Sequence, residues 1–511
     1  TPQGEHGHVN GHEYEGARRR GRMRSVAVAL ALCSSWASAA LGQANGTPAQ
    51  QNNSYAIDLY QGPILAPIRV TALSGAYAGY AEGIAGFVAN AASPAVRSAH
   101  SVNWLELDLD ASLSIPVSLF DNNDFDNSGD LDADYSSFLY LAAGAQLQAG
   151  ALGAGIFADL QRYDLVTGGA STAVTVGRYH GLVAWQLLGD QLVLGGGVRA
   201  ATLGVSAPEA ELTNVGAAPQ FGILLRPDWT PFRVGATYRH AVRAAWSVGS
   251  GATVDERGVE RAGALVVPAY AELPWEIETG IALQVGPRPL NPEWINPRDH
   301  EQQLVDSYER RRRLRERQRR RQLSLVSDPA TRSRMAREEL LEEERVARRE
   351  HRRLVRELAL LRDERKARAR NWPREHLLLT AEVLVTGPVS DAIHLARFLA
   401  QGQRAGGDSQ CRAVASGEDL NFSPRIGLEM EPVPQYVHTR FGTYYEPNRF
   451  RYEPDSCDDR VGRQHFTFGA DVKLASTTWF GLVPEVTYKL QGYGDLAPRY
   501  QAFGLGMGVW Y

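Results

Sequence analysis

The feature that most constrains this chain is a repeated alternation of apolar and polar side chains over segments of about ten residues. In segment 465–474, Phe466 and Phe468 lie on one face, whereas Asp471 lies on the other. Alternation with a period of two is the pattern of a β-strand with two unlike faces. The clearest segments are 105–115, 233–243, 276–285, 377–386, 425–431, 465–474 and 485–491. No apolar run reaches the ~18 residues of a membrane-spanning helix, and the 44% apolar content excludes global disorder.

A soluble β-sandwich also alternates, so three further features are needed to favour a membrane barrel. Segments of about ten residues are long enough to cross the hydrocarbon core when tilted. Short turns near 149–152, 189–191, 226–231 and 475–480 alternate with longer polar loops. The chain ends on an alternating strand with a terminal aromatic residue, Tyr511, as is typical of outer-membrane barrels. We therefore predict an all-β membrane protein, an antiparallel outer-membrane β-barrel of about fourteen strands.

The predicted strands are even in number, as expected for bacterial barrels. They start near Trp104, Ser136, Ala151, Thr172, Leu192, Ala217, Phe232, Pro274, His376, Ser423, Tyr436, His465, Leu482 and Gln501. With both barrel ends in the periplasm, Cys411 and Cys457 fall in two extracellular loops. An even pair of cysteines in an exported chain favours a disulfide. The cationic insert 288–375 falls between the eighth and ninth strands and is therefore expected in the periplasm. If one strand before Cys411 is miscounted, the insert lies outside the cell instead.

The amino-terminal stretch 1–42 has the pattern of a Sec signal peptide. A basic cluster ending at Arg24 precedes a short apolar run, and small residues follow up to Ala40. We expect cleavage after Ala39 or Gly42. Cys33 resembles a lipoprotein cysteine only superficially, because the bulky Leu32 precedes it.

Insert 288–375 differs sharply from the rest of the chain. It holds 26 basic and 17 acidic residues, about +9, in a chain whose formal net charge is −4. Segments 299–325 and 331–370 have helical character, with a break at Pro329. Leu340, Ala347, Leu354 and Leu361 recur every seven residues, which predicts a helical hairpin or short coiled coil. We expect it to bind a periplasmic protein, peptidoglycan, lipid or a second copy through 299–370, or to be a solvated helix without a ligand.

Charged side chains occupy the strand faces that we assign to the lumen. They are Asp108, Asp110, Arg239, Glu278, Glu429, Asp471, Lys473, Glu485 and Lys489. Buried charges are costly unless they are paired or hydrated, so we expect a hydrated, ion-paired lumen with a structural role. The sequence offers no convincing catalytic set, zinc spacing, phosphate loop or dinucleotide fingerprint, so we predict neither an enzyme nor a cofactor. In the acidic stretch 121–134, Asp124, Asp126, Ser128 and Asp130 are a weak calcium candidate; a solvated outer loop fits better.

Before the first strand, segment 69–95 contains Gly75-Ala76-Tyr77, then Ala81-Glu82, and then Asn90 and Pro94-Ala95. This segment resembles the amino-terminal region of FadL-like long-chain fatty-acid transporters of the outer membrane. The resemblance implies a hatch folded into the lumen of a fourteen-stranded barrel. Its candidate hatch residues are Arg69, Gly75, Tyr77, Glu82, Ile84, Phe87, Val88, Asn90 and Pro94. Two features depart from the family, namely the three residues between Asn90 and Pro94 and the helical insert.

The expected domains are the removed leader 1–42, the hatch 43–102, barrel strands one to eight in 103–287, the insert 288–375 and strands nine to fourteen in 376–511. The resemblance implies porin-like uptake of hydrophobic small molecules, such as long-chain fatty acids, across the outer membrane of a Gram-negative bacterium. The alternative is a structural or interaction barrel whose periplasmic hairpin docks envelope or secretion machinery, since some members of this superfamily serve secretion. Expected partners are outer-membrane lipid and a hydrophobic ligand, and the export signal argues against nucleic acid.

Overall fold

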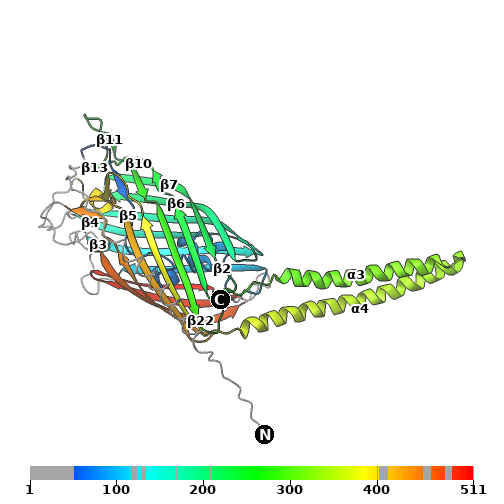
Figure 1. The fold of residues 1–511 in the computed structure, drawn as a ribbon. Coiled ribbons are helices and arrows are strands. Elements are labelled where there is room, and N and C mark those ends of the chain that lie inside the picture. Colours follow the sequence, from blue (N-terminus) through cyan, green and yellow to red (C-terminus); the bar gives the residue numbers. More distant parts are fainter. Residues whose placement is uncertain are drawn as a thin grey trace, which may run out of the picture. The chain divides into compact units, whose positions relative to one another are not determined.

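The structure, a computed structural model, describes residues 51–99, 101–116, 124–127, 134–167, 170–207, 209–399, 401, 413–452, 462–477 and 486–509. Within these residues, fourteen antiparallel strands form one closed barrel (Figure 1). Closure comes from pairing of the first barrel strand with the last, Asp110 opposite Gly508, and from pairing of β7 with β8, Gln220 opposite Arg239. The fold therefore confirms the predicted barrel and its strand number.

The barrel strands follow one another around the wall in chain order. They are β2 (Leu105–Pro116), β3 (Asp134–Ala149), β4 (Leu152–Thr167), β5 (Ala170–Leu187), β6 (Leu192–Ala207), β7 (Ala210–Leu225), β8 (Phe232–Arg239), β15 (Glu276–Val285), β16 (Leu377–Thr386), β19 (Asn421–Val433), β20 (Val437–Glu446), β22 (Arg463–Thr477), β23 (Val486–Ala497) and β24 (Tyr500–Val509). Most begin within a few residues of their predicted starts. The largest differences are at β7, expected near Ala217, and at β23, expected near Leu482.

The wall has the burial pattern of a membrane barrel rather than of a soluble sandwich. In β15 the apolar Ile277, Ile281 and Val285 are exposed, whereas Glu278 on the opposite face is buried. Apolar side chains outside and polar ones inside are what a hydrocarbon solvent selects. Because each strand bonds to two neighbours around a closed wall, no barrel strand leaves an unpaired edge in lipid. None of the helices in the described residues is long and apolar enough to cross a membrane.

The connections between the strands distinguish the two ends of the barrel. The loop end carries the long connections 117–133, 240–275, 387–420 and 447–462, and the hairpin end carries the insert between β15 and β16. Within their described residues, the loop-end connections contain short strands and one helix. They are β9 (Val242–Ala244), β10 (Trp246–Ser250), β11 (Ala252–Val254), β12 (Glu260–Ala262), β13 (Leu265–Val266), β14 (Tyr270–Leu273), β17 (Ala392–His394), α5 (Leu395–Leu399), β18 (Ala413–Ser416) and β21 (Phe450–Tyr452).

The chain before the barrel runs through the lumen from the loop end to the hairpin end. It begins with β1 (Ala56–Asp58), which lies between β14 and β17 and pairs with both in parallel. The short helices α2 (Ile68–Ala72), η1 (Ile84–Val88) and η2 (Ser93–Ala95) follow, and all three pack against the inner face of the wall. This luminal segment is the hatch expected from the FadL-like resemblance.

The insert forms two long antiparallel helices, α3 (Pro297–Ser324) and α4 (Pro329–Arg370) (Figure 1). Each begins with proline at its first position, where the missing N–H has no helical partner to lose. The preceding Asn296 and Asp328 accept hydrogen bonds from the backbone N–H groups of Arg298 and Thr331. Such caps satisfy donors that a helix start leaves open.

Candidate functional site: the hatch and the loop-end chamber

An apolar cluster fills the loop end of the lumen. We call this cluster, with the space that it fills, the loop-end chamber. Its wall comes from the loop-end parts of β4 to β7, and its filling comes from β1 and the long connections. The buried members include Tyr55, Ile57, Leu59, Tyr163, Leu165, Val174, Val176, Leu203, Val205, Leu212, Val266, Ile393 and Phe398. Three of them, Tyr55, Ile57 and Leu59, belong to the amino-terminal segment, so this segment occupies the only apolar cluster of this size among the described residues.

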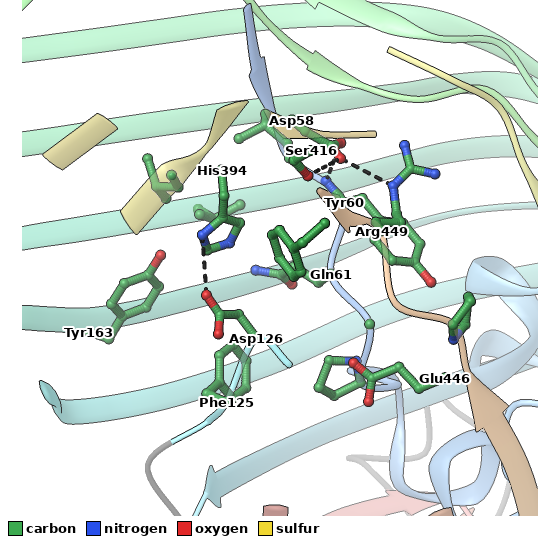
Figure 2. Close-up of a pocket in the computed structure, with 17 residues that line it drawn as sticks. Asp58, Tyr60, Gln61, Phe125, Asp126, Tyr163, His394, Ser416, Glu446 and Arg449 are labelled. Carbon is green, nitrogen blue, oxygen red and sulfur yellow. Dashed lines mark hydrogen bonds and ion pairs between the residues drawn. The ribbon is translucent and has the colours of Figure 1, made fainter. Parts of the chain in front are cut away.

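A small cavity lies where the chamber meets the polar lumen (Figure 2). Leu59, Tyr60, Phe125, Tyr163 and Phe450 supply its apolar and aromatic lining. The cavity measures about 30 Å³, roughly room for one water molecule. In this conformation the chamber is therefore filled by the protein's own side chains, and no hydrophobic molecule fits without displacing part of the lining.

Polar side chains of the same cavity hold the amino-terminal segment in place. Asp58 accepts hydrogen bonds from the Ser416 hydroxyl at 2.9 Å and the Arg449 Nε at 3.1 Å. The Arg449 guanidinium also lies 4.6 Å from the ring centre of Tyr60. Asp58 and Arg449 are both buried, so this ion pair is shielded from solvent. The amino-terminal segment is thus fixed to three loop-end connections, by strand pairing with β14 and β17 and by the ion pair with Arg449.

Below the chamber, the lumen is lined by an alternating series of arginines and carboxylates. Arg199 and Arg239 pair with Glu276 at 2.8 and 3.2 Å, and Arg239 also pairs with Glu278. Arg425 then joins Glu278 to Glu382, at 3.0 Å each. A cavity of about 120 Å³ lies against this series. The lumen is therefore charged and ion-paired along this series.

A second buried network fixes α2 of the hatch to the wall. Arg69 binds Glu429 through two hydrogen bonds, at 2.8 and 3.0 Å. Arg440 donates to the same Glu429 at 2.6 Å and grips Asp471 through both of its terminal nitrogens. Two-pronged arginine–carboxylate contacts fix orientation as well as distance. The wall carboxylate Glu429, which binds Arg69 of the hatch, is thus itself held in place by Arg440.

Glu82 anchors the middle of the hatch to β8. Its carboxylate lies 2.9 Å from the Arg233 guanidinium and accepts a hydrogen bond from the Tyr80 hydroxyl at 2.7 Å. Burial alone would raise the pKa of Glu82, but Arg233, Arg69 and Arg288 outweigh it and hold that pKa below its usual value. Burial, with the nearby Glu82 charge, raises the pKa of Tyr80 to about 12, so its hydroxyl stays a donor.

The hatch backbone lies so close to the wall that a side chain at Gly75 or Gly83 would meet a wall side chain. Gly75 has φ +74°, and a Cβ there would lie 2.7 Å from the Arg425 guanidinium. Gly83 has φ +68°, and a Cβ there would lie 2.5 Å from Asp108, whose carboxylate accepts from the Ile84 N–H. The left-handed conformation favours glycine, so the small residues of the motif follow from this close contact.

The remaining predicted hatch residues also contact the wall. Tyr77 donates its backbone N–H to Glu382, Phe87 packs with Ile84 against Phe157, and the Val88 carbonyl accepts from Arg239. The Asn90 amide donates to the Ala78 and Ile223 carbonyls, which holds the turn where the family has adjacent Asn-Pro. The Pro94 carbonyl accepts from Gln146 and Gln148.

The predicted lumen residues lie on the inner face wherever the structure describes them. Asp110 accepts from Gln491, Lys489 lies 3.6 Å from Asp471, and Lys473 lies over the Tyr436 ring. Glu485, Cys411 and Cys457 lie outside the described residues, as do Ser128, Asp130 and the leader 1–42. Asp126 pairs with His394 at 3.1 Å, and no cluster of three possible metal ligands occurs among the described residues.

Sequence reasoning missed the loop-end chamber and its Asp58–Arg449 anchor. The amino-terminal segment 55–59 reads Tyr-Ala-Ile-Asp-Leu, which is a strand-like signal, but its partners β14 and β17 come from connections more than 200 residues away. Parallel pairing of short strands from distant loops leaves no local pattern in the sequence. The alternation Tyr163, Leu165 and Val174, Val176 on the inner face was the one available sign of an apolar loop end.

No known family model matches the chain, and no curated protein matches it in sequence. Solved structures similar to it include a FadL homologue from Pseudomonas aeruginosa, at 9% identity and TM-score 0.44, covering 88% of this chain and 99% of that one. The monoaromatic hydrocarbon channel CymD, at 8% identity and TM-score 0.42, covers 88% and 97%. A deletion mutant of the channel TodX, at 10% identity and TM-score 0.40, covers 88% and 98%. The chain's own closed wall of fourteen antiparallel strands, with its amino-terminal segment packed inside the lumen, is the architecture that the sequence resemblance implies.

Proposed function

We propose that this barrel admits hydrophobic small molecules, such as long-chain fatty acids, at its loop end, and that segment 55–63 is the gate. The observation that carries the proposal is the loop-end chamber, the largest apolar cluster among the described residues, which lies above a series of buried arginine–carboxylate pairs. Apolar surface at a water-facing mouth is costly unless it is covered. In this chain the cover is its own amino-terminal segment.

The gate is held by few contacts, as expected of a segment that a ligand can displace. Its apolar side chains Tyr55, Ile57 and Leu59 fill the space that a hydrophobic ligand would take. Its main-chain pairing is limited to a three-residue strand, and among the described residues it adds one ion pair, Asp58–Arg449, and a few side-chain hydrogen bonds. When this short segment leaves the chamber, the free energy of its apolar packing is lost. A ligand that buries a comparable apolar area in the same space can offset that loss.

Uptake of a labelled long-chain fatty acid into liposomes tests the proposal. We expect liposomes containing the wild-type barrel to take up the label faster than protein-free liposomes. Deletion of 299–370, with a short linker joining β15 to β16, is expected to leave the rate within about twofold, because the hairpin lies outside the chamber. Uptake no faster than in protein-free liposomes overturns the proposal.

The hairpin carries the second candidate function, a barrel that docks envelope or secretion machinery. Its support is the arginine-rich surface of α3 and α4, which the uptake proposal does not use. Absence of uptake, together with a bound partner that is lost on deletion of 299–370, favours this alternative.

A further inference from the structure

The hairpin of α3 and α4 lacks a hydrophobic core of its own. Pro297 and Tyr308 are the buried residues of α3, and α4 contributes none among its described side chains. Several apolar side chains are instead more than half exposed, namely Leu314, Leu340, Leu341, Val355 and Leu360. Helices in proteins owe most of their stability to packing of an apolar face. The hairpin therefore carries apolar surface that a further packing partner would cover.

The charges of the hairpin are segregated rather than mixed. Residues 310–321 of α3 comprise nine arginines and one glutamate, and residues 338–344 of α4 comprise five glutamates and no basic residue. Exposed Leu314 lies within the first segment, and exposed Leu340 and Leu341 lie within the second. Each segment thus has apolar side chains surrounded by charge of a single sign, and the two signs are opposite.

The hairpin's own ion pairs leave much of this charge unused. Arg315 turns toward α4 and pairs with Glu350 and Glu343. Among the described residues, no ion pair joins Arg310, Arg317 or Arg321 to a carboxylate, and all three are exposed. They share one face of α3, because positions seven and eleven residues apart lie on the same side of a helix. That face points away from α4, since Arg315 and Tyr308 occupy the opposite side.

On α4, Glu338 has no ion pair within the described residues, and its exposed neighbours Glu342 and Glu344 pair only with arginines of their own helix. Such exposed pairs within one helix contribute little, so these carboxylates can exchange partners. The contact of Arg315 with Glu343 also places the glutamate segment beside the distal part of the arginine segment. Both surfaces therefore lie at neighbouring heights along the hairpin.

We propose that the hairpins of two copies of this chain associate, with the arginine segment 310–321 of one copy against the glutamate segment 338–344 of the other. Copies embedded in one membrane share their height, so surfaces at neighbouring heights can meet without tilting either barrel. Arginine and glutamate then form intermolecular charged contacts, and Leu314, Leu340 and Leu341 become covered. Complementary charge also sets the register and rejects unlike partners.

Charge reversal on the full-length protein in nanodiscs or mild detergent tests this. One variant carries Arg310→Glu, Arg317→Glu and Arg321→Glu, and the other carries Glu338→Arg, Glu342→Arg and Glu344→Arg. We expect the wild type to associate at low salt, by light scattering after size exclusion. Each variant alone is expected to bind its own copies about a hundredfold more weakly, because like charges now face each other. An equimolar mixture of the two variants is expected to regain the wild-type mass.

A matched control changes the same amount of charge elsewhere on the hairpin, through Arg356→Glu, Lys366→Glu and Arg368→Glu, and should still associate. Circular dichroism reports whether every variant keeps its helices. A wild type that stays monomeric at low salt overturns the proposal, as does association that survives either reversal or a mixture that fails to associate. Binding of a monomeric wild type to cardiolipin vesicles or purified peptidoglycan would identify an anionic polymer or lipid as the partner instead.

Discussion

Single buried charges decide how firmly the hatch is held, and Glu82 is the sharpest case. Its partner Arg233 is completely buried and also donates to the Tyr80 and Leu290 carbonyls. Those carbonyls satisfy guanidinium protons but do not neutralise its charge. Removing one member of a buried ion pair costs about 3–5 kcal/mol, because the other charge is left without compensation.

We therefore expect Glu82→Gln to loosen the hatch and to expose residues around 81–86 to amide hydrogen exchange. The pKa of Glu82 is held below its usual value of 4.5, so its charge stabilises the docked hatch above that value. This stabilisation is lost as the pH falls through the lowered pKa. The protection of the amides at 81–86, taken relative to their intrinsic exchange rates at each pH, should thus fall on acidification in the wild type and respond less in the variant. Glu256→Gln, at an exposed loop position, is the control. Equal exchange in wild type and Glu82→Gln at neutral pH would contradict the assigned role.

Sequence periodicity predicts the barrel strands well because each strand faces two different solvents, lipid on one side and the polar lumen on the other. In β15, for example, one register shift would put Glu278 into lipid, so the sequence must keep strict alternation. The early start of β7 at Ala210 has a different cause. Leu212 there packs in the loop-end chamber, where the inner face is apolar and alternation no longer marks the strand.

Strand β1 of the gate could not be predicted in the same way, because its partner strands are set by tertiary contacts. Ala56 lies opposite Ala392 of β17, and both side chains belong to one buried cluster with Val389. Neighbouring strand positions facing the same side are within the Cα separations that a disulfide accepts. A disulfide between cysteines at these two positions would therefore fix the gate to β17 and add little side-chain volume.

We expect Ala56→Cys/Ala392→Cys, in a background with Cys33, Cys411 and Cys457 changed to Ser, to block fatty-acid uptake when oxidised. Reduction should restore it, because the gate can then leave the chamber. Each single cysteine variant, under the same oxidation, is the control and should transport normally. Uptake that is unchanged with the disulfide formed would show that β1 does not need to move.

At the scale of the whole molecule, the decisive property is an outer surface that is apolar around a charged interior. Ile281, at the middle of β15, is 54% exposed, and Val254 in the loop-end strand β11 is 67% exposed. In water an arginine at either position would be tolerated, since both side chains point away from the protein. In a bilayer the two positions differ, because only the first faces hydrocarbon.

Ile281→Arg is therefore expected to destabilise the folded barrel by about 2–4 kcal/mol in lipid, the cost of a cation at the bilayer midplane. Val254→Arg should change the free energy of unfolding by no more than about 0.5 kcal/mol, as for an ordinary surface substitution. Denaturant titrations in phospholipid vesicles measure both, and heat-modifiable migration on gels reports the folded fraction. The contrast arises because hydrocarbon cannot solvate the guanidinium at 281, whereas water can do so at 254. Equal, small effects at the two positions would mean that the outer face of β15 is in water, and the barrel would then not be a membrane barrel.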